Sequence, residues 1–150
     1  MIYVIVLLTV LLDQLSKAFI LSGLMAGGVI SLAPFFNLVL TFNKGVSFSF
    51  LTSDSPLMPW ILSGFALFIC LGICFWLRSE KDRLTRIGLA LILGGAVGNV
   101  IDRIRLGAVV DFLDFYIGQY HWPAFNIADS AICIGVALIL IRSFWRGKNK

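Results

Sequence analysis

"PAFNIADSAICIGVALIL", residues 123–140, is apolar enough to cross a membrane as a helix, yet it carries a carboxylate, Asp129, near its start. Of the 150 residues, 59% are hydrophobic and only 13% are charged. About a quarter of the residues of a soluble domain are charged. The chain shows no basic stripe of the kind that binds nucleic acid. The composition therefore predicts an α-helical integral membrane protein.

Four segments approach the roughly 20 apolar residues that a membrane span requires. They lie at about 2–22, 57–77, 87–106 and 125–141. The first differs from a cleaved secretory signal, because Asp13 and Lys17 interrupt it, no Lys or Arg precedes its apolar run, and no A-x-A site follows. We therefore expect one membrane-embedded domain, residues 1–150, with four transmembrane helices.

The basic residues predict the orientation of these helices. Eight of the twelve Lys and Arg residues lie in two segments, 78–86 and 142–150, which two spans separate. Because cytoplasmic loops are enriched in Lys and Arg, we expect both termini on the cytoplasmic side. The stretches 23–56 and 107–124 then face outward.

The outward stretches carry β-type and aromatic patterns. Residues 29–51 are rich in Phe, Val and Thr and partly alternate, which favours short strands at the membrane surface, although 44–51 fits a short helix equally well. Residues 107–124 are aromatic, as is typical of a membrane interface. Within them we expect Asp114 to be a solvated acid and His121 an interfacial residue rather than a metal ligand.

Unusual polar residues of three helices gather at one depth, near the outer face. Converting sequence position to depth at about 1.5 Å per residue brings together Asp13 and Lys17 of the first helix, Asn99, Asp102 and Arg103 of the third, and Asn126 and Asp129 of the fourth. Ionisable residues at membrane depth usually face the bundle interior and find partners. We therefore expect an ion pair between Asp13 and Lys17, four residues apart.

Two interpretations of these polar side chains at a common depth remain open from the sequence alone. The polar side chains could form a buried network that only ties helices together, with Asn126 as the N-cap of the fourth helix and Asp129 as its N3 acid. They could also form a reactive site, in which a strand or loop after the third helix returns Asp111 over the bundle toward Asp129.

The available catalytic groups are carboxylates. The cysteines, Cys70, Cys74 and Cys133, lie in apolar segments without metal-ligand spacing to His121, so we expect small buried residues and no metal site. Two facing carboxylates can share a proton and titrate as a coupled pair. The ionised acid then takes a proton from water while the protonated acid polarises a carbonyl, which hydrolyses an amide without a cofactor.

Five ordered motifs resemble those of the lipoprotein signal peptidase family, also called signal peptidase II. They are DQLSK (13–17), FNKGVSFSF (42–50), GNVIDR (98–103), VVDF (109–112) and FNIAD (125–129). The resemblance implies an aspartic peptidase that cleaves bacterial prolipoproteins just before the diacylglyceryl-modified cysteine. It also implies an outer β-cradle and a short surface helix that closes over the substrate.

The resemblance assigns roles to individual residues. It implies a catalytic dyad of Asp111 and Asp129. It implies site-shaping or substrate-holding roles for Asn43, Asn99, Asp102, Arg103 and Asn126, and a structural or lipid-facing role for Asp13 and Lys17. We expect no cofactor, a lipid-modified prolipoprotein as substrate, contacts with membrane lipids, a monomer in the bacterial inner membrane, and an active site near its outer face.

Two competing functions differ in where they place polar groups. A small proton- or ion-coupled transporter would relay protons through membrane acids, but a relay distributes acids across the membrane, whereas these gather at one face. A scaffold subunit held together by buried polar pairs would use Gly94 and Gly98 for helix packing and would tolerate Asn at Asp111 and Asp129.

Overall fold

The computed structural model describes residues 2–24, 27–45 and 56–148. Most of the segment 44–51, for which strand and short helix both remained open, lies outside the described residues, as does the surface helix that the resemblance implies.

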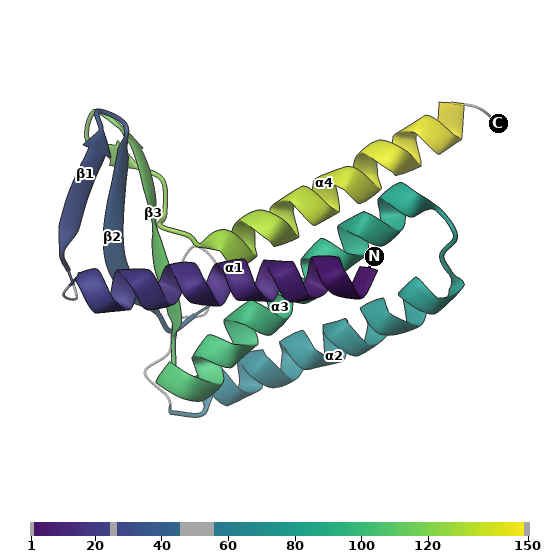
Figure 1. The fold of residues 1–150 in the computed structure, drawn as a ribbon, viewed down its shortest axis with the longest axis horizontal. Helices are drawn as coiled ribbons and strands as arrows, with labels where there is room; N and C mark the ends of the chain where they lie inside the picture. The colour runs from purple at the N-terminus through teal and green to yellow at the C-terminus, as the bar shows by residue number, and fades with distance from the viewer. Residues whose placement is uncertain (1, 25–26, 46–55, 149–150) are drawn as a thin grey trace.

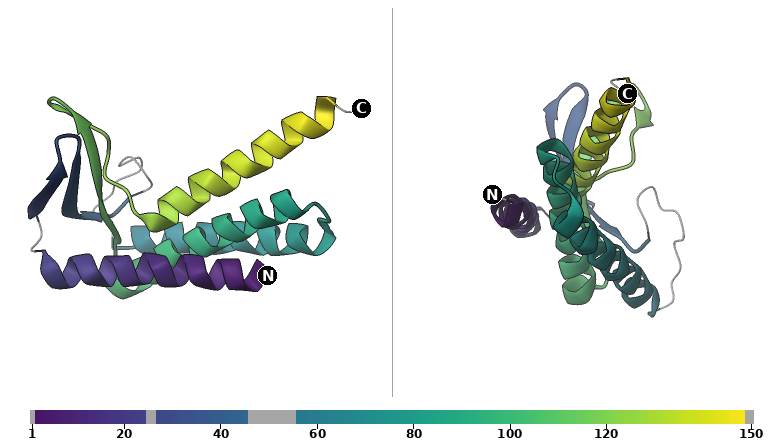
Figure 2. Two further views of the ribbon diagram at one scale, coloured as in Figure 1. Left: turned by 45° about the horizontal axis from the view of Figure 1, so that its top comes forward. Right: turned by 90° about the vertical axis from the view of Figure 1, so that its right-hand side faces the viewer.

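Four helices confirm the four predicted spans, and each is long and apolar enough to cross a membrane. They are α1 (Ile2–Gly23), α2 (Met58–Ser79), α3 (Arg83–Leu106) and α4 (Ile127–Lys148). Helix α3 packs against each of the other three, and α4 diverges from α1 toward its C-terminal end (Figure 2). Helix α3 begins four residues earlier than predicted because Asp82 caps it, accepting a hydrogen bond from the Thr85 backbone N–H at 3.0 Å.

A four-stranded antiparallel sheet stands at the end of the bundle where α1 and α3 end and α4 begins (Figure 1). Its strands, in the order β1-β2-β3-β4, are β1 (Val29–Ala33), β2 (Phe36–Asn43), β3 (Val109–Ile117) and β4 (Tyr120–His121). Strand β2 of the first outward stretch pairs with β3 of the second. The strands predicted within 29–51 are thus confirmed over the residues that the structure describes.

A small apolar cluster packs this sheet against α1. Ile20 of α1, Leu40 of β2, and Val110 and Phe112 of β3 are buried against one another. Gly107, with a φ of 72°, ends α3 in the left-handed conformation that glycine adopts most easily. The turn lets the chain leave α3 and enter β3 within two residues, which fixes β3 beside the ends of the helices.

Glycines on α3 allow its neighbours to approach closely. A Cβ atom at Gly95 would lie 2.4 Å from the Ala128 carbonyl oxygen of α4, and one at Gly94 would lie 2.7 Å from Cβ of Thr9 on α1. Small residues at helix interfaces permit this backbone contact in membrane proteins. The predicted packing role of Gly94 and Gly98 agrees with this geometry, since a Cβ at Gly98 would meet an Asp13 carboxylate oxygen at 2.5 Å.

Two expectations from the sequence are wrong. Asp114 is not solvated: it is 6% exposed, because the β2–β3 register places it opposite Asn37, whose Nδ2 donates to it at 3.0 Å. Its carboxylate also contacts His121 Nδ1 at 2.9 Å. Cys70 is buried, but Cys74 and Cys133 are exposed, because each lines an open hollow of the protein surface.

The glycine packing predicts that two alanine substitutions differ in their effect on the free energy of unfolding. Gly95→Ala forces a methyl group against the α4 backbone, so we expect a loss of about 1–3 kcal/mol in unfolding free energy. Gly72→Ala is the matched control, since nothing lies within 4 Å of its added Cβ, and we expect neutral or increased stability. Thermal unfolding in detergent micelles measures both, and equal stability of the two variants would contradict the packing.

Candidate active site

The Lys17 ammonium lies at the centre of a buried polar cluster. Its Nζ is 2.8 Å from an Asp13 oxygen, 2.8 Å from an Asp102 oxygen and 3.0 Å from the Asn99 side-chain oxygen. Lys17 is 2% exposed. Three acceptors match the three N–H donors of an ammonium, so the predicted Asp13–Lys17 pair is confirmed and extended to α3.

The two acids of this cluster also hold other elements. The second Asp13 oxygen accepts the Ala128 backbone N–H in the first turn of α4 at 2.9 Å. Asp102 accepts the Val110 backbone N–H of β3 at 3.1 Å. A buried charge is tolerated when it is paired and its remaining lone pairs are satisfied, and here those lone pairs bind the start of α4 and the start of β3.

Gln14 is a member of the cluster that the sequence did not single out. Its Nε2 lies within hydrogen-bonding distance of both acids, at 2.9 Å from Asp102 and 3.2 Å from Asp13, and also 3.2 Å from the Gly98 carbonyl oxygen. Only its place in the DQLSK motif, one residue after Asp13, could have indicated it, because a neutral amide gives no charge signal.

Asn99 connects this cluster to Asp129. While its side-chain oxygen accepts from Lys17, its Nδ2 donates to Asp129 Oδ1 at 2.8 Å. Asp129 is partly exposed, so one face of this carboxylate is held by the network and the rest is accessible.

Asn126 joins the two acids that the resemblance singles out. Its side-chain oxygen accepts the Asp129 backbone N–H at 2.9 Å, and its Nδ2 donates to Asp111 Oδ1 at 2.7 Å. The first bond is the predicted N-cap interaction with the N3 residue, so the capping interpretation is confirmed. The second bond shows that the same buried side chain also contacts Asp111.

Asp111 lies on β3, outside the helices, and is 3% exposed. Its second oxygen accepts Asn43 Nδ2 of β2 at 3.0 Å. Burial disfavours the charged form and raises the pKa of Asp111 from 3.8 to about 7. The Asn43 hydrogen bond opposes this shift, and the neighbouring charge of Asp129 adds to it. Burial therefore favours the protonated form of Asp111 over a wider pH range than for an exposed carboxyl.

Arg103 reaches the network indirectly. Its Nη2 donates to the Gly45 carbonyl oxygen at 3.0 Å, and the Gly45 backbone N–H donates to the Asn43 side-chain oxygen at 3.0 Å. Arg103 thus fixes the chain directly after β2, next to the residue that contacts Asp111. All nine side chains predicted for the site are brought together in this way.

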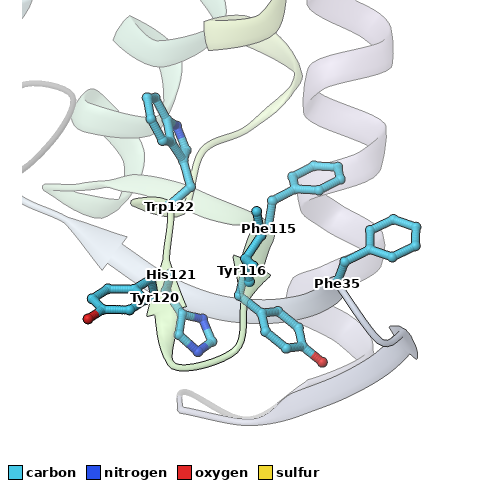
Figure 3. A pocket seen from close by; sticks show the side chains of 7 residues that line it. Phe35, Phe115, Tyr116, Tyr120, His121 and Trp122 are labelled. Atoms are coloured by element: carbon cyan, nitrogen blue, oxygen red, sulfur yellow. The ribbon is translucent and has the colours of Figure 1, made fainter.

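Two apolar hollows lie outside the helix interior on this side of the molecule. One, of about 360 Å³, includes Asp129 and is otherwise largely apolar, with Phe125, Ile132 and Cys133 among its lining residues. The other, of about 580 Å³, is aromatic and surrounds the β3–β4 turn (Figure 3). There the His121 and Tyr116 rings stack at 4.9 Å, and none of its lining residues is a carboxylate. Of these two hollows, the first alone includes a carboxylate among its lining residues, that of Asp129.

The arrangement has the chemistry of a paired-carboxylate site. One acid is buried and protonates near neutrality, whereas the other is accessible from an apolar hollow. Their direct partners in the network are neutral amides, which orient carboxylates without neutralising them. Such a pair is suited to general acid–base chemistry on a group brought in from the membrane.

Comparison with solved structures gives the class. Two structures, described as bacterial membrane enzymes and determined by the in meso method at 2.3 Å and 1.9 Å resolution, match with TM-scores of 0.90 and 0.82, each at 30% identity. They cover 99% and 94% of this chain, which in turn covers 90% of each. The fold is that of a multi-pass bacterial membrane enzyme.

The family follows from sequence. The protein-family sequence model described as signal peptidase (SPase) II matches residues 5–145 of this chain. Lipoprotein signal peptidases of Azoarcus sp. (strain BH72) and Polynucleobacter necessarius subsp. necessarius (strain STIR1) are 48% and 50% identical over 140 and 137 residues. These alignments cover 93% and 91% of this chain and 80% and 84% of the relatives. The chain belongs to the signal peptidase II family and is a multi-pass protease of the bacterial inner membrane.

The central ammonium predicts a large stability effect. Lys17→Met keeps most of the side-chain volume but leaves Asp13 and Asp102 buried without their cation, so we expect a loss of about 3–5 kcal/mol in unfolding free energy. Lys81→Met, at an exposed position in the α2–α3 connection, is the matched control and should be close to neutral. Chemical unfolding in micelles compares the two, and a Lys17 variant as stable as the Lys81 variant would show that the cluster is not a structural centre.

Proposed function

We propose that this protein is an aspartic endopeptidase that removes the signal peptide from diacylglyceryl-modified prolipoproteins, cutting before the lipidated cysteine. The observation that carries the proposal is the pairing of Asp111 and Asp129 through Asn126, beside a hollow that is open to Asp129. Membership of the signal peptidase II family supplies the substrate class.

The different environments of the two acids give them different roles, Asp111 as the general acid and Asp129 as the general base. Asp111, whose pKa is raised to about 7, holds the shared proton and polarises the scissile carbonyl. Asp129, which is more exposed and oriented by Asn99, takes a proton from the attacking water. The water oxygen bonds to the carbonyl carbon to form a tetrahedral intermediate. The C–N bond then breaks as Asp129 returns the proton to the nitrogen, which leaves as the amine of the lipidated cysteine.

The apolar hollow supports a lipid-bearing substrate. Its walls at Phe125, Ile132 and Cys133 suit hydrocarbon, while Asp129 provides its polar end. Binding energy from the lipid and the signal helix positions the peptide bond at the carboxylates. In the predicted orientation, with both termini cytoplasmic, this site faces the outer leaflet, and one copy of the chain acts as a monomer among membrane lipids.

A transporter is the alternative function, and the placement of the acids disfavours it. Asp13, Asp102, Asp111 and Asp129 form one connected group near the sheet. The opposite half of the spans contributes no carboxylate to this group, so the described residues offer no continuous relay.

Amide substitutions test the dyad. Asp111→Asn and Asp129→Asn each remove an ionisable oxygen while keeping size, so we expect cleavage of a purified lipid-modified prolipoprotein to fall by at least about 10²–10⁴-fold. Asp114→Asn, three residues along the same strand, is the control and should retain activity. Thermal unfolding confirms that each variant is folded, and substantial turnover by either dyad variant would exclude the mechanism.

The pH dependence tests the role of Asp111. Ionisation as the pH rises through about 7 removes its proton, so kcat/KM should fall above neutrality. Asn43→Ala removes a donor that favours the ionised form. The pKa of Asp111 then rises, and this limb moves to higher pH. Thr41→Val is the control, because within the described part of the chain the Thr41 hydroxyl donates to the Asp111 backbone oxygen and not to its carboxylate. If the fall of kcat/KM above neutrality stayed at the same pH in Asn43→Ala, or shifted equally in Thr41→Val, Asp111 would not be the group whose ionisation causes it.

A further inference from the structure

A second polar feature lies at the opposite end of the bundle from the carboxylates. A groove of about 430 Å³ is lined by residues of α1, α2 and α3. The N-terminal end of α1 and the α2–α3 connection lie at this end of the bundle (Figure 1). Arg78 of α2 and Arg86 of α3 both line it. The peptidase mechanism uses neither residue.

The two guanidinium groups lack a protein counter-ion in the part of the chain that the structure describes. Neither forms a salt bridge there, and the Arg86 Nε is buried without a hydrogen-bond partner. Arg78 contacts the Phe75 ring at 5.5 Å. A buried donor without a partner carries a desolvation cost, so an acceptor from outside the chain would stabilise this arrangement.

The nearby acids are already engaged. Asp82, at the start of α3, accepts from Arg142 Nε at 2.7 Å and caps Thr85. Glu80 accepts from Trp76 Nε1 and from the Lys81 backbone N–H. Among the described residues, neither of these acids forms a salt bridge with Arg78 or Arg86, and both guanidinium groups line the groove.

The polarity of the groove changes along the helix axis. Leu93 lies seven residues after Arg86 on α3, about 10 Å deeper, and Val6 of α1 also lines the apolar part. Tyr3, which is 88% exposed, lies near the arginine edge, where amphipathic aromatic residues meet the membrane interface. A charged edge above an apolar wall matches a phosphate headgroup above acyl chains.

We propose that this groove is a binding site for one anionic phospholipid, with its phosphate on Arg78 and Arg86 and an acyl chain along Val6 and Leu93. Basic pockets between membrane helices bind such headgroups, and guanidinium groups bind phosphate well because their N–H donors form a planar fork. In the predicted orientation the lipid belongs to the cytoplasmic leaflet. The site is independent of the peptidase chemistry.

Lipid retention by the full-length protein in detergent tests the proposal. Native mass spectrometry with phosphatidylglycerol should show one retained lipid, and phosphatidylethanolamine with the same acyl chains should be retained more weakly. The double variant Arg78→Gln/Arg86→Gln should lower the phosphatidylglycerol affinity by about tenfold to thirtyfold. Arg83→Gln, at the same end of α3 but outside the groove lining, should bind as the wild type does.

Three results would overturn the lipid site. Equal retention of the two lipids would remove the charge requirement, and an Arg83→Gln loss as large as that of the double variant Arg78→Gln/Arg86→Gln would indicate general surface charge. Displacement of phosphatidylglycerol by inorganic phosphate at comparable concentration would identify a phosphate site without an acyl-chain component.

Cysteine labelling gives a second measurement that needs no arginine variant. Cys74 lines the groove and is exposed, while the exposed Cys133 lines the hollow beside Asp129. Phosphatidylglycerol, but not phosphatidylethanolamine, should slow maleimide modification of Cys74 and leave Cys133 unchanged. Equal protection of the two thiols would count against a lipid at this position.

Discussion

Burial of one ammonium at membrane depth is the constraint on which the rest of the structure depends. Removing an ion from water costs several kcal/mol even after relaxation, and the Lys17 ammonium is compensated only if three oxygen acceptors converge on it. Asp13 lies one turn away on α1, whereas Asn99 and Asp102 come from α3. The remaining acceptor capacity of Asp13 and Asp102 then binds the starts of α4 and β3. The hydrogen bonds that compensate the Lys17 charge therefore fix α1, α3, α4 and β3 relative to one another.

Close backbone contact makes this compensation geometrically possible. The short Asp13 side chain reaches the Ala128 backbone N–H of α4 and lies directly against Gly98 of α3, because Gly95 and Gly98 let the helices approach. Gly95 and Gly98 lie on the same stretch of α3 as Asn99 and Asp102, so close helix contact and the polar contacts occur together there.

The sequence predicted the parts of this structure that depend on local pattern. Helix positions follow from hydropathy, and the common depth of Lys17, Asp102 and Asn126 follows from helical rise. What the sequence could not provide is register between distant strands. The pairing of β2 with β3 decides that Asp114 is buried opposite Asn37 and that Asn43 contacts Asp111. Gln14 was missed for a related reason, since the role of a neutral amide depends entirely on its neighbours.

The donors around two asparagines determine how the acids are held. The Lys17 ammonium can only donate, so the oxygen of the Asn99 amide must face it as the acceptor, which turns Asn99 Nδ2 toward Asp129. In the same way the Asp129 backbone N–H selects the oxygen of Asn126 and turns its Nδ2 toward Asp111. A flip of either amide would set donor against donor. The cap of α4 and the contact to Asp111 are therefore one interaction, because the helix start that places Asp129 also orients the donor that holds its partner acid.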